Sequence, residues 1–123
     1  MRDNSEYTLR KQSDFSRVYS KGRSRGSKYV VVLYRKNNLG YTRTAFVSSK
    51  KVGNSVERNR SRRLMRESYR SFNKKIIEGY DIVFVARNTI NGTGKDEVQR
   101  VMYAAVRSCG LLNNSNNRQG HEK

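Results

Sequence analysis

Residues 43–87 read RTAFVSSKKVGNSVERNRSRRLMRESYRSFNKKIIEGYDIVFVAR, and this stretch decides the fold. β-Branched and aromatic residues at 42–49 and 81–87 predict two strands. Apolar residues at helical spacing between them predict a long helix over residues 55–77. Asn54, followed three positions later by Glu57, indicates a capping box at its start, and Gly79 ends it. Two strands joined through a helix imply parallel neighbours or near neighbours in one sheet.

The flanking segments add further elements. Residues 12–21 predict a helix with Phe15, Val18 and Tyr19 on one face, capped by Ser13 or Asp14. Residues 29–34 predict a strand, residues 23–28 a basic loop and residues 95–109 a last helix. The polar end from residue 111 predicts a frayed tail. We expect one α/β domain over residues 1–112, with helices packed against a small sheet, and a disordered polar tail over 113–123.

Composition limits the class of protein. The chain has 123 residues, 27 lysines and arginines against 10 acids, a net charge of +17 and an apolar content of 34%. This length suits one domain. No apolar run approaches the roughly 20 residues of a membrane span, and the start of the chain lacks the apolar core of a signal peptide. A single cysteine cannot form an internal disulfide. We therefore expect a cytoplasmic protein whose partner is a polyanion, with nucleic acid as the default.

The charge concentrates on the long helix. Residues 50–70 hold eight basic side chains against Glu57 and Glu67. On a helical wheel an apolar arc that includes Leu64, Met65 and Tyr69 faces one way, and the arginines occupy the other side. A solvated face is the ordinary meaning of a charge run, but such a face normally mixes signs to gain i,i+4 pairs. Arginine suits bidentate phosphate contacts, and free N–H groups at a helix start bind phosphate. The pattern favours a surface that binds the backbone of structured RNA or DNA.

Residues 49–67, SKKVGNSVERNRSRRLMRE, resemble the signature of the bacterial ribonuclease P protein subunit. The family pattern has a Lys-Lys-x-Gly start, an Arg-Asn-Arg core, a basic pair and a further arginine. The resemblance continues through the first helix and the strand at 80–87, so it covers roughly residues 9–112. Ser55, Ser61 and the pair Thr44-Ala45 depart from the family pattern, and none of them removes a charge or an aromatic ring.

The resemblance implies a two-layer α/β (α+β) sandwich similar to domain 2 of ribosomal protein S5, in the order αβββαβα. It also implies a left-handed βαβ crossover, which is an exception to the usual hand. This order requires one short strand that the pattern of residues does not reveal.

The resemblance also implies a function. The partner would be the catalytic RNA of ribonuclease P, in a one-to-one complex that removes the 5′ leader of precursor tRNA. The RNA and its Mg²⁺ ions would carry the chemistry, and this chain would supply no catalytic residue and no metal ligand. A ribosomal or other structural RNA-binding protein is the alternative that composition alone supports equally. A stand-alone nuclease is the poorest alternative, because clustered carboxylates for two metals are missing from the sequence pattern.

The family motif assigns a set of residues to the RNA subunit and to phosphates near the cleavage site. Asn59 has a second interpretation, as a local cap, and Arg63 could partly serve the fold. More diffuse phosphate attraction is expected from basic residues around the first helix, including Lys21 and Arg23. The motif residues are Lys50, Lys51, Arg58, Asn59, Arg60, Arg62, Arg63 and Arg66.

Phe15, Tyr19 and Tyr34 match, or nearly match, the family's aromatic positions in a cleft for the single-stranded leader. Stacking on such rings tolerates any base. Without the resemblance, the better interpretation of Phe15 and Tyr19 is that they pack in the core. A gapless alignment places Leu33, not Tyr34, at the family's strand position, and a slip of one residue reverses the face of the sheet. Cys109 and His121 are expected to have no chemical role, and Asp96 with Glu97 to be acids of a helix start.

Overall fold

The computed structural model describes residues 7–113, and these form three α-helices, two 3₁₀ turns and four strands. The elements are α1 (Gln12–Lys21), β1 (Arg23–Gly26), β2 (Val30–Lys36), β3 (Arg43–Val47), α2 (Ser55–Arg70), η2 (Asn73–Lys75), β4 (Tyr80–Ala86), η3 (Asn88–Ile90) and α3 (Lys95–Ser108). None of the helices in this part of the chain is long and apolar enough to cross a bilayer.

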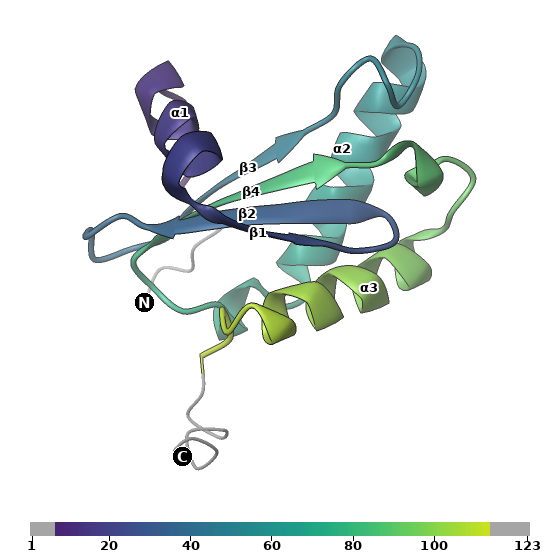
Figure 1. Cartoon of the computed structure of the whole chain (residues 1–123). Coiled ribbons are helices and arrows are strands. Elements are labelled where there is room, and N and C mark those ends of the chain that lie inside the picture. The colour runs from purple at the N-terminus through teal and green to yellow at the C-terminus, as the bar shows by residue number, and fades with distance from the viewer. Residues whose placement is uncertain (1–6, 114–123) are drawn as a thin grey trace.

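The four strands form one sheet in the order β1-β2-β4-β3. β4 pairs antiparallel with β2 and parallel with β3, so the chain crosses from β3 through α2 to the neighbouring strand, as expected. The helix α1 lies on one face of the sheet, and α2 and α3 lie on the other (Figure 1). With β3 behind β4 and α2 below both, this crossover has the left-handed sense that the resemblance implied (Figure 1).

Alternation along the strands divides the apolar residues between two clusters. The larger cluster fills the space between the sheet and α2 and α3, and Val32 and Phe84 belong to it. The smaller cluster lies under α1 and includes Val18, Val83 and, at its margin, Leu33. α1 is therefore a thin layer on its face of the sheet, with a small core of its own.

The strand β1 occupies residues where the sequence predicted a loop, and that prediction is wrong. All of its residues are exposed, so no apolar alternation marks them. Its register pairs Arg23 with Tyr34 and Gly26 with Val31. An edge strand of polar residues carries no hydrophobic signal, which is why only the resemblance required it.

The long helix is shorter than predicted, since α2 ends at Arg70 and not at residue 77. Phe72 and Ile76 are buried, as the periodicity indicated, but a turn and η2 carry them into the core. Ile76 forms an antiparallel bridge with Leu112, and the backbone N–H of Ile77 donates to the carbonyl of Leu111 at 2.9 Å. These tertiary bonds replace the helical ones.

The same contacts correct the expected frayed tail. Leu111 is buried in the large cluster, and the backbone N–H of Asn113 donates to the carbonyl of Lys75. The folded region therefore extends through Asn113, one residue beyond the expected boundary. The rest of the expected tail, including His121, lies outside the described residues.

Candidate nucleic-acid interface

A complete capping box starts the basic helix, as the sequence predicted. The Asn54 side chain accepts from the backbone N–H of Glu57 at 2.9 Å, and the Glu57 carboxylate accepts from the backbone N–H of Asn54 at 2.9 Å. Gly53 precedes the cap with φ +145°, a conformation that only glycine adopts without strain. The box fixes the start of α2 at Ser55, so Lys50 and Lys51 lie in the loop that leads into the charged helix.

The helix α2 has one buried and one charged side. Its buried residues are Ser61, Leu64, Met65, Ser68 and Tyr69, which rest on the sheet and α3. Among the motif residues Lys50, Lys51, Asn59, Arg63 and Arg66 are exposed, and Arg58, Arg60 and Arg62 are partly buried. The structure thus brings the motif residues together around the solvent side of one helix and the loop before it.

Three of the arginines also make bonds within the protein. Arg58 donates to the Gly53 carbonyl at 2.8 Å, and Arg60 donates to the Thr93 carbonyl at 2.6 Å. Arg62 donates to the Asn59 side chain, so Asn59 orders an arginine of its own helix and is not a cap. Arg58 and Arg60 therefore hold the loops at either side of the helix start as well as carrying charge.

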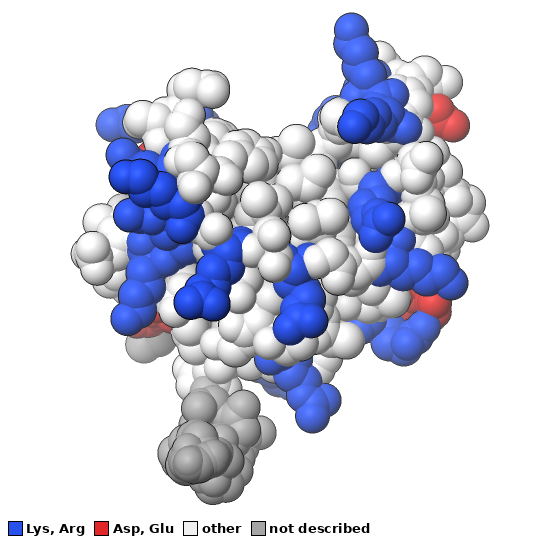
Figure 2. Space-filling view, viewed as in Figure 1, with Lys and Arg blue, Asp and Glu red and all other residues white. Residues whose placement is uncertain are grey.

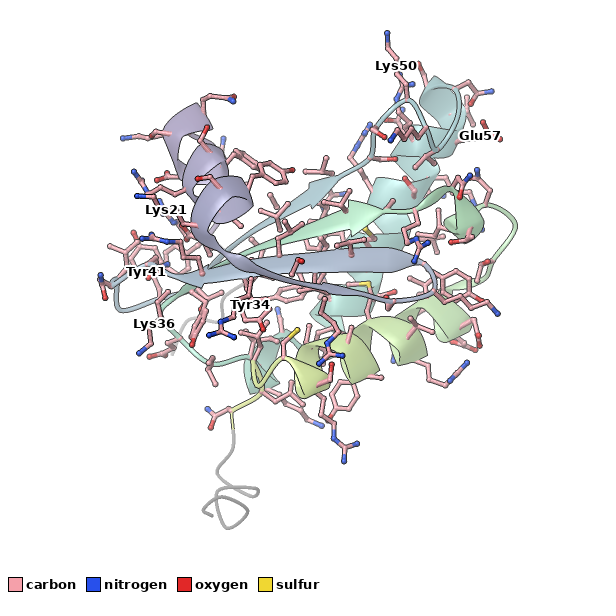
Figure 3. The ribbon with its side chains drawn as sticks, in the orientation of Figure 1. Lys21, Tyr34, Lys36, Tyr41, Lys50 and Glu57 are labelled. Atoms are coloured by element: carbon pink, nitrogen blue, oxygen red, sulfur yellow. The ribbon has the colours of Figure 1, made fainter. Side chains whose placement is uncertain are left out.

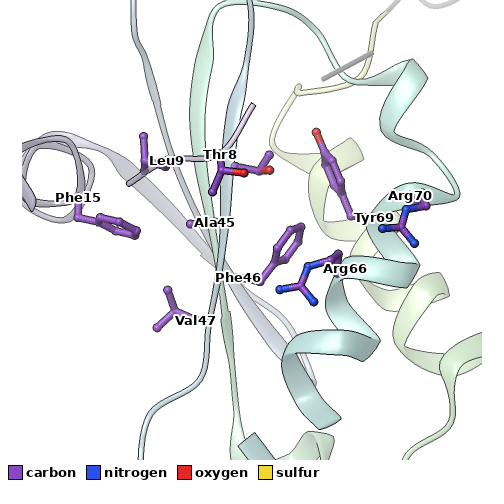
Figure 4. A pocket seen from close by; sticks show the side chains of 10 residues that line it. Thr8, Leu9, Phe15, Ala45, Phe46, Val47, Arg66, Tyr69 and Arg70 are labelled. Carbon is purple, nitrogen blue, oxygen red and sulfur yellow. The ribbon is translucent and has the colours of Figure 1, made fainter. Parts of the chain in front are cut away.

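A cleft of about 320 Å³ opens between α1 and α2 at the outer edge of β3. Phe15 projects into it from α1, while Phe46, Arg66 and Arg70 lie across β3 on the α2 side (Figure 4). The guanidinium of Arg66 lies 5.6 Å from the centroid of the Phe46 ring. Figure 2 shows an uncharged saddle between blue patches of lysine and arginine on the α1 side and at the start of α2.

The N-terminal segment closes the floor of this cleft. The backbone N–H of Leu9 donates to the Thr44 carbonyl at 2.8 Å, and Thr8 forms a parallel bridge with Thr44. Thr8 and Leu9 therefore line the cleft, together with Ala45 and Val47 of β3. Sequence reasoning missed Phe46, Arg70 and these N-terminal residues. Only the alternation of β3 and the position of Arg70 one turn after Arg66 could have indicated them.

The first-helix aromatics lie together, as expected. Phe15 and Tyr19 stack with ring centroids 6.4 Å apart and an interplanar angle of 21°. Phe15 is partly buried against the small cluster, whereas Tyr19 is 50% exposed, which plain core packing does not explain. Desolvation nevertheless raises the pKa of the Tyr19 phenol, so the ring is neutral at physiological pH.

Tyr34 does not share this cleft, and its placement with Phe15 and Tyr19 was wrong. Its ring packs against the large cluster, on the face of the sheet that α3 covers, while its neighbour Leu33 packs with Phe15. Figure 3 shows Tyr34 below the sheet, with α1 above it. The physical reason is the two-residue period of a strand, which puts only one of two consecutive residues on the α1 face. Leu33, the residue that the gapless alignment favours, lies on the α1 face.

Carboxylates are scarce on this side of the molecule. Within residues 7–113 no group of three or more His, Cys, Asp or Glu side chains could hold a metal ion.

Asp96 and Glu97 lie in the first turn of α3, as expected of helix-start acids, and Glu97 pairs with Arg100 at 2.7 Å. Cys109 is half-buried, and burial raises the pKa of its thiol.

Comparisons with known proteins agree with this architecture. The family model for ribonuclease P matches residues 4–110. The ribonuclease P protein component of Alkaliphilus oremlandii (strain OhILAs) is 40% identical over 107 residues, which cover 87% of this chain and 94% of that protein. The solved RNase P protein of Thermotoga maritima superimposes with a TM-score of 0.75 at 30% identity, over 82% of this chain and 96% of that one.

A second solved structure, the RNase P protein of Staphylococcus aureus, superimposes with a TM-score of 0.78 at 29% identity, over 87% of this chain and 98% of that one. Sequence and structure thus agree over nearly the full length of the relatives. This agreement supports a role in tRNA 5′ processing and gives no support to the alternative of a ribosomal or other structural RNA-binding protein. The chain belongs to the ribonuclease P protein family, the protein components of the ribonucleoprotein that cleaves the leaders of precursor tRNAs.

Proposed function

We propose that this chain binds the catalytic RNA of ribonuclease P through the charged side of α2 and the 5′ leader of precursor tRNA through the cleft between α1 and α2. One observation carries the proposal: a continuous row of arginines on α2 ends at Arg66 and Arg70, and these same two side chains line the cleft. A single helix therefore connects a surface for a folded RNA with a channel for a single strand.

The α2 surface suits the RNA backbone. Arg63 and Arg66 are exposed, and guanidinium groups bind phosphates through paired N–H donors. Lys50 and Lys51 add charge beside the helix start, where the remaining backbone N–H groups attract anions. Glu57 forms the capping box, and α2 still carries six arginines against Glu57 and Glu67.

The cleft suits an unpaired strand. Phe15 offers a ring face on one wall, and Tyr19 stacks on Phe15 outside the lining. Base stacking on aromatic rings is worth about 1–3 kcal/mol per base without sequence preference. Arg66 and Arg70 supply charge for the phosphates on the opposite wall. Between the walls the lining combines the apolar Ala45 and Val47 with the hydroxyl-bearing Thr8 and Thr44.

The chemistry belongs to the RNA in this proposal, and Mg²⁺ is held by the RNA and the precursor tRNA. The cationic α2 surface supports this, because it repels a divalent cation and attracts the phosphates that bind one. The proposed complex contains one protein and one RNA, and its proposed location is the cytoplasm.

The test replaces the two motif arginines that make no bonds to other elements, in the double variant Arg62→Ala with Arg63→Ala. Removing one phosphate contact lowers the slope of log K against log salt by roughly 0.7–0.9. We expect the slope for the catalytic RNA to fall by about 1.4–1.8, and pre-tRNA cleavage at low Mg²⁺ to lose its stimulation by the protein.

A charge-matched control, Lys74→Ala with Arg100→Ala, removes two exposed cations that belong neither to α2 nor to the lining of the cleft. We expect its slope and stimulation to match those of the unaltered protein. Equal slopes for both double variants would contradict the assignment of the α2 surface, and metal-dependent cleavage by the protein without RNA would contradict the division of labour.

A further inference from the structure

A notch interrupts the edge of the sheet at the far end from Lys50. β1 begins at Arg23, opposite Tyr34, so Arg35 and Lys36 of β2 extend beyond it without a β1 partner. The resulting space measures about 250 Å³ and lies between the end of α1 and the starts of β1 and β4. We call it the β2 notch. Its lining includes Lys21, Arg23, Tyr34, Arg35, Lys36 and Tyr80.

Gly22 builds the notch by letting the end of α1 approach β2. A Cβ at this position would lie 2.5 Å from the Val18 carbonyl oxygen and 2.8 Å from the Tyr34 carbonyl oxygen. Both atoms belong to the backbone and cannot move aside as a flexible side chain does. The close approach of the end of α1 to β2 is therefore a feature of the backbone path.

The notch has an unbalanced charge. It is lined by four cations and no carboxylate, and within residues 7–113 none of the four forms an ion pair. Asp81 lies opposite Arg35 in the sheet, but its carboxylate is engaged by Arg43 and Asn37 and forms no ion pair with Arg35. Glu78 is exposed outside the lining. Clustered unpaired cations repel one another and attract an anion.

Two aromatic rings accompany this charge. Tyr34 and Tyr80 are partly buried, with ring centroids 6.4 Å apart and planes inclined by 46°. Burial, chiefly, raises the pKa of Tyr34, so its phenol remains a neutral hydrogen-bond donor. Figure 3 places Tyr34 and Lys36 on the same side of the sheet, and Lys21, at the end of α1, also lines the notch. Rings next to unpaired cations are the combination that binds a nucleotide unit of a single strand.

We propose that the β2 notch is a third RNA contact, which holds one or two nucleotides of unpaired RNA. Lys21, Arg23 and Lys36 bind the phosphates, and the base packs against Tyr34 and Tyr80. The proposal rests on the proposed function for the identity of the partner as RNA. It goes beyond that function because the notch lies at the opposite end of the sheet from Lys50 (Figure 3) and across the sheet from the cleft.

The first test is the double variant Arg23→Ala with Lys36→Ala, compared with Lys74→Ala plus Arg100→Ala as a charge-matched control. All four side chains are exposed, so both variants fold. Kd is measured against salt in two arms: for the catalytic RNA, and for precursor tRNA with short and long leaders bound to the assembled holoenzyme. The notch variant is expected to lose about 1.4 in slope in one arm, because single-strand phosphate contacts contribute about 0.7 each.

The second test addresses the base. Tyr34→Leu keeps an apolar side chain in the large cluster and removes the ring face. Its Kd in the same arm is expected to rise at least about fivefold. A photo-crosslinker at Lys36→Cys in a Cys109→Ser background identifies the RNA without depending on the folding of the Tyr34 variant.

A change in the first arm, with crosslinks in the catalytic RNA, assigns the notch to that RNA. A change confined to long leaders, with crosslinks in the leader, assigns it to the substrate. A notch variant that behaves like its control and crosslinks to neither RNA overturns the proposal. The variant Arg62→Ala with Arg63→Ala separates the proposed function from the notch proposal. If this variant loses RNA binding while the notch variants keep it, the proposed function stands and the notch proposal is wrong.

Discussion

Arg43 and Asp81 form a bidentate pair between the neighbouring strands β3 and β4. Arg43 Nε lies 2.8 Å from Asp81 Oδ1 and Nη2 lies 2.8 Å from Oδ2. The same guanidinium reaches Asp14 of α1 at 3.2 Å. Both carboxylates are buried, and the bonds to Asp81 are the main reason that the pKa of Arg43 is raised. One arginine thus joins α1 to the sheet.

Arg43→Ala is expected to destabilise the fold by about 3 kcal/mol, because it leaves two buried carboxylates without their shared cation. The loss is measured as the free energy of unfolding in urea. Because α1 carries one wall of the cleft, affinity for the leader falls further than affinity for the catalytic RNA.

Arg100→Ala is the control for this prediction. It breaks the exposed Arg100–Glu97 pair on α3, and exposed pairs contribute little. We expect its unfolding curve to match that of the unaltered protein. An Arg43→Ala curve equally unchanged would show that the bidentate pair does not hold α1.

Gly22 and Gly26 offer a matched pair of glycine substitutions. Gly22→Ala forces a Cβ to within 2.5 Å of the Val18 carbonyl oxygen, and we expect a loss of about 1–3 kcal/mol from overpacking. Gly26→Ala meets no atom within 4 Å, and its smaller unfolded-state entropy adds about 0.4–1 kcal/mol. Thermal melting of the two variants should shift in opposite directions, and shifts of the same sign would contradict the close approach of α1 to β2.

Asn54 and Asn59 are expected to separate folding from binding. Asn54→Ala removes a capping-box acceptor and should cost about 1 kcal/mol of stability, measured by denaturant unfolding. Asn59→Ala lies on the exposed side of α2 and releases Arg62, so it should leave stability unchanged and weaken RNA binding. A destabilised Asn59 variant would show that its side chain serves the fold.

Tyr19→Leu tests the aromatic pair that Tyr19 forms with Phe15 beside the cleft. The ring is half exposed, so its removal affects the core little, and each stacked base is worth about 1–3 kcal/mol of leader affinity. Holoenzyme affinity for precursor tRNA should fall, while affinity for mature tRNA without a leader should not change. A parallel decrease for both RNAs would contradict a leader-specific role.

The sequence predicted the elements whose own residues carry an apolar period. The bounds of α1 match, and the buried positions Leu64, Met65 and Tyr69 of α2 lie where the wheel placed them. The expected caps of α1 are wrong. Asp14 points inward and pairs with Arg43 and Arg17. The residue at the N-cap is Lys11, which makes no side-chain capping bond. A carboxylate near a helix start looks the same in sequence whether it caps or forms a tertiary pair.

Features set by partners distant in sequence could not be predicted. The end of α2 depends on the bridge from Ile76 to Leu112, and the face of Tyr34 depends on strand register. Ser61 departs from the family pattern, yet it is fully buried, with its hydroxyl 2.8 Å from Ser48 Oγ. A polar residue in a core position is explained only by the partner that the fold supplies.

The central position of β4 has a consequence for synthesis of the chain. Of the four strands in residues 7–113, β4 is the last to be translated, and it lies between β2 and β3. Until residue 86 has left the ribosome, these two strands have no partner between them, while the arginines of α2 have already emerged beside ribosomal RNA. Folding is therefore completed late. The nascent chain is exposed to ribosomal RNA before β4 has joined β2 and β3 in the sheet.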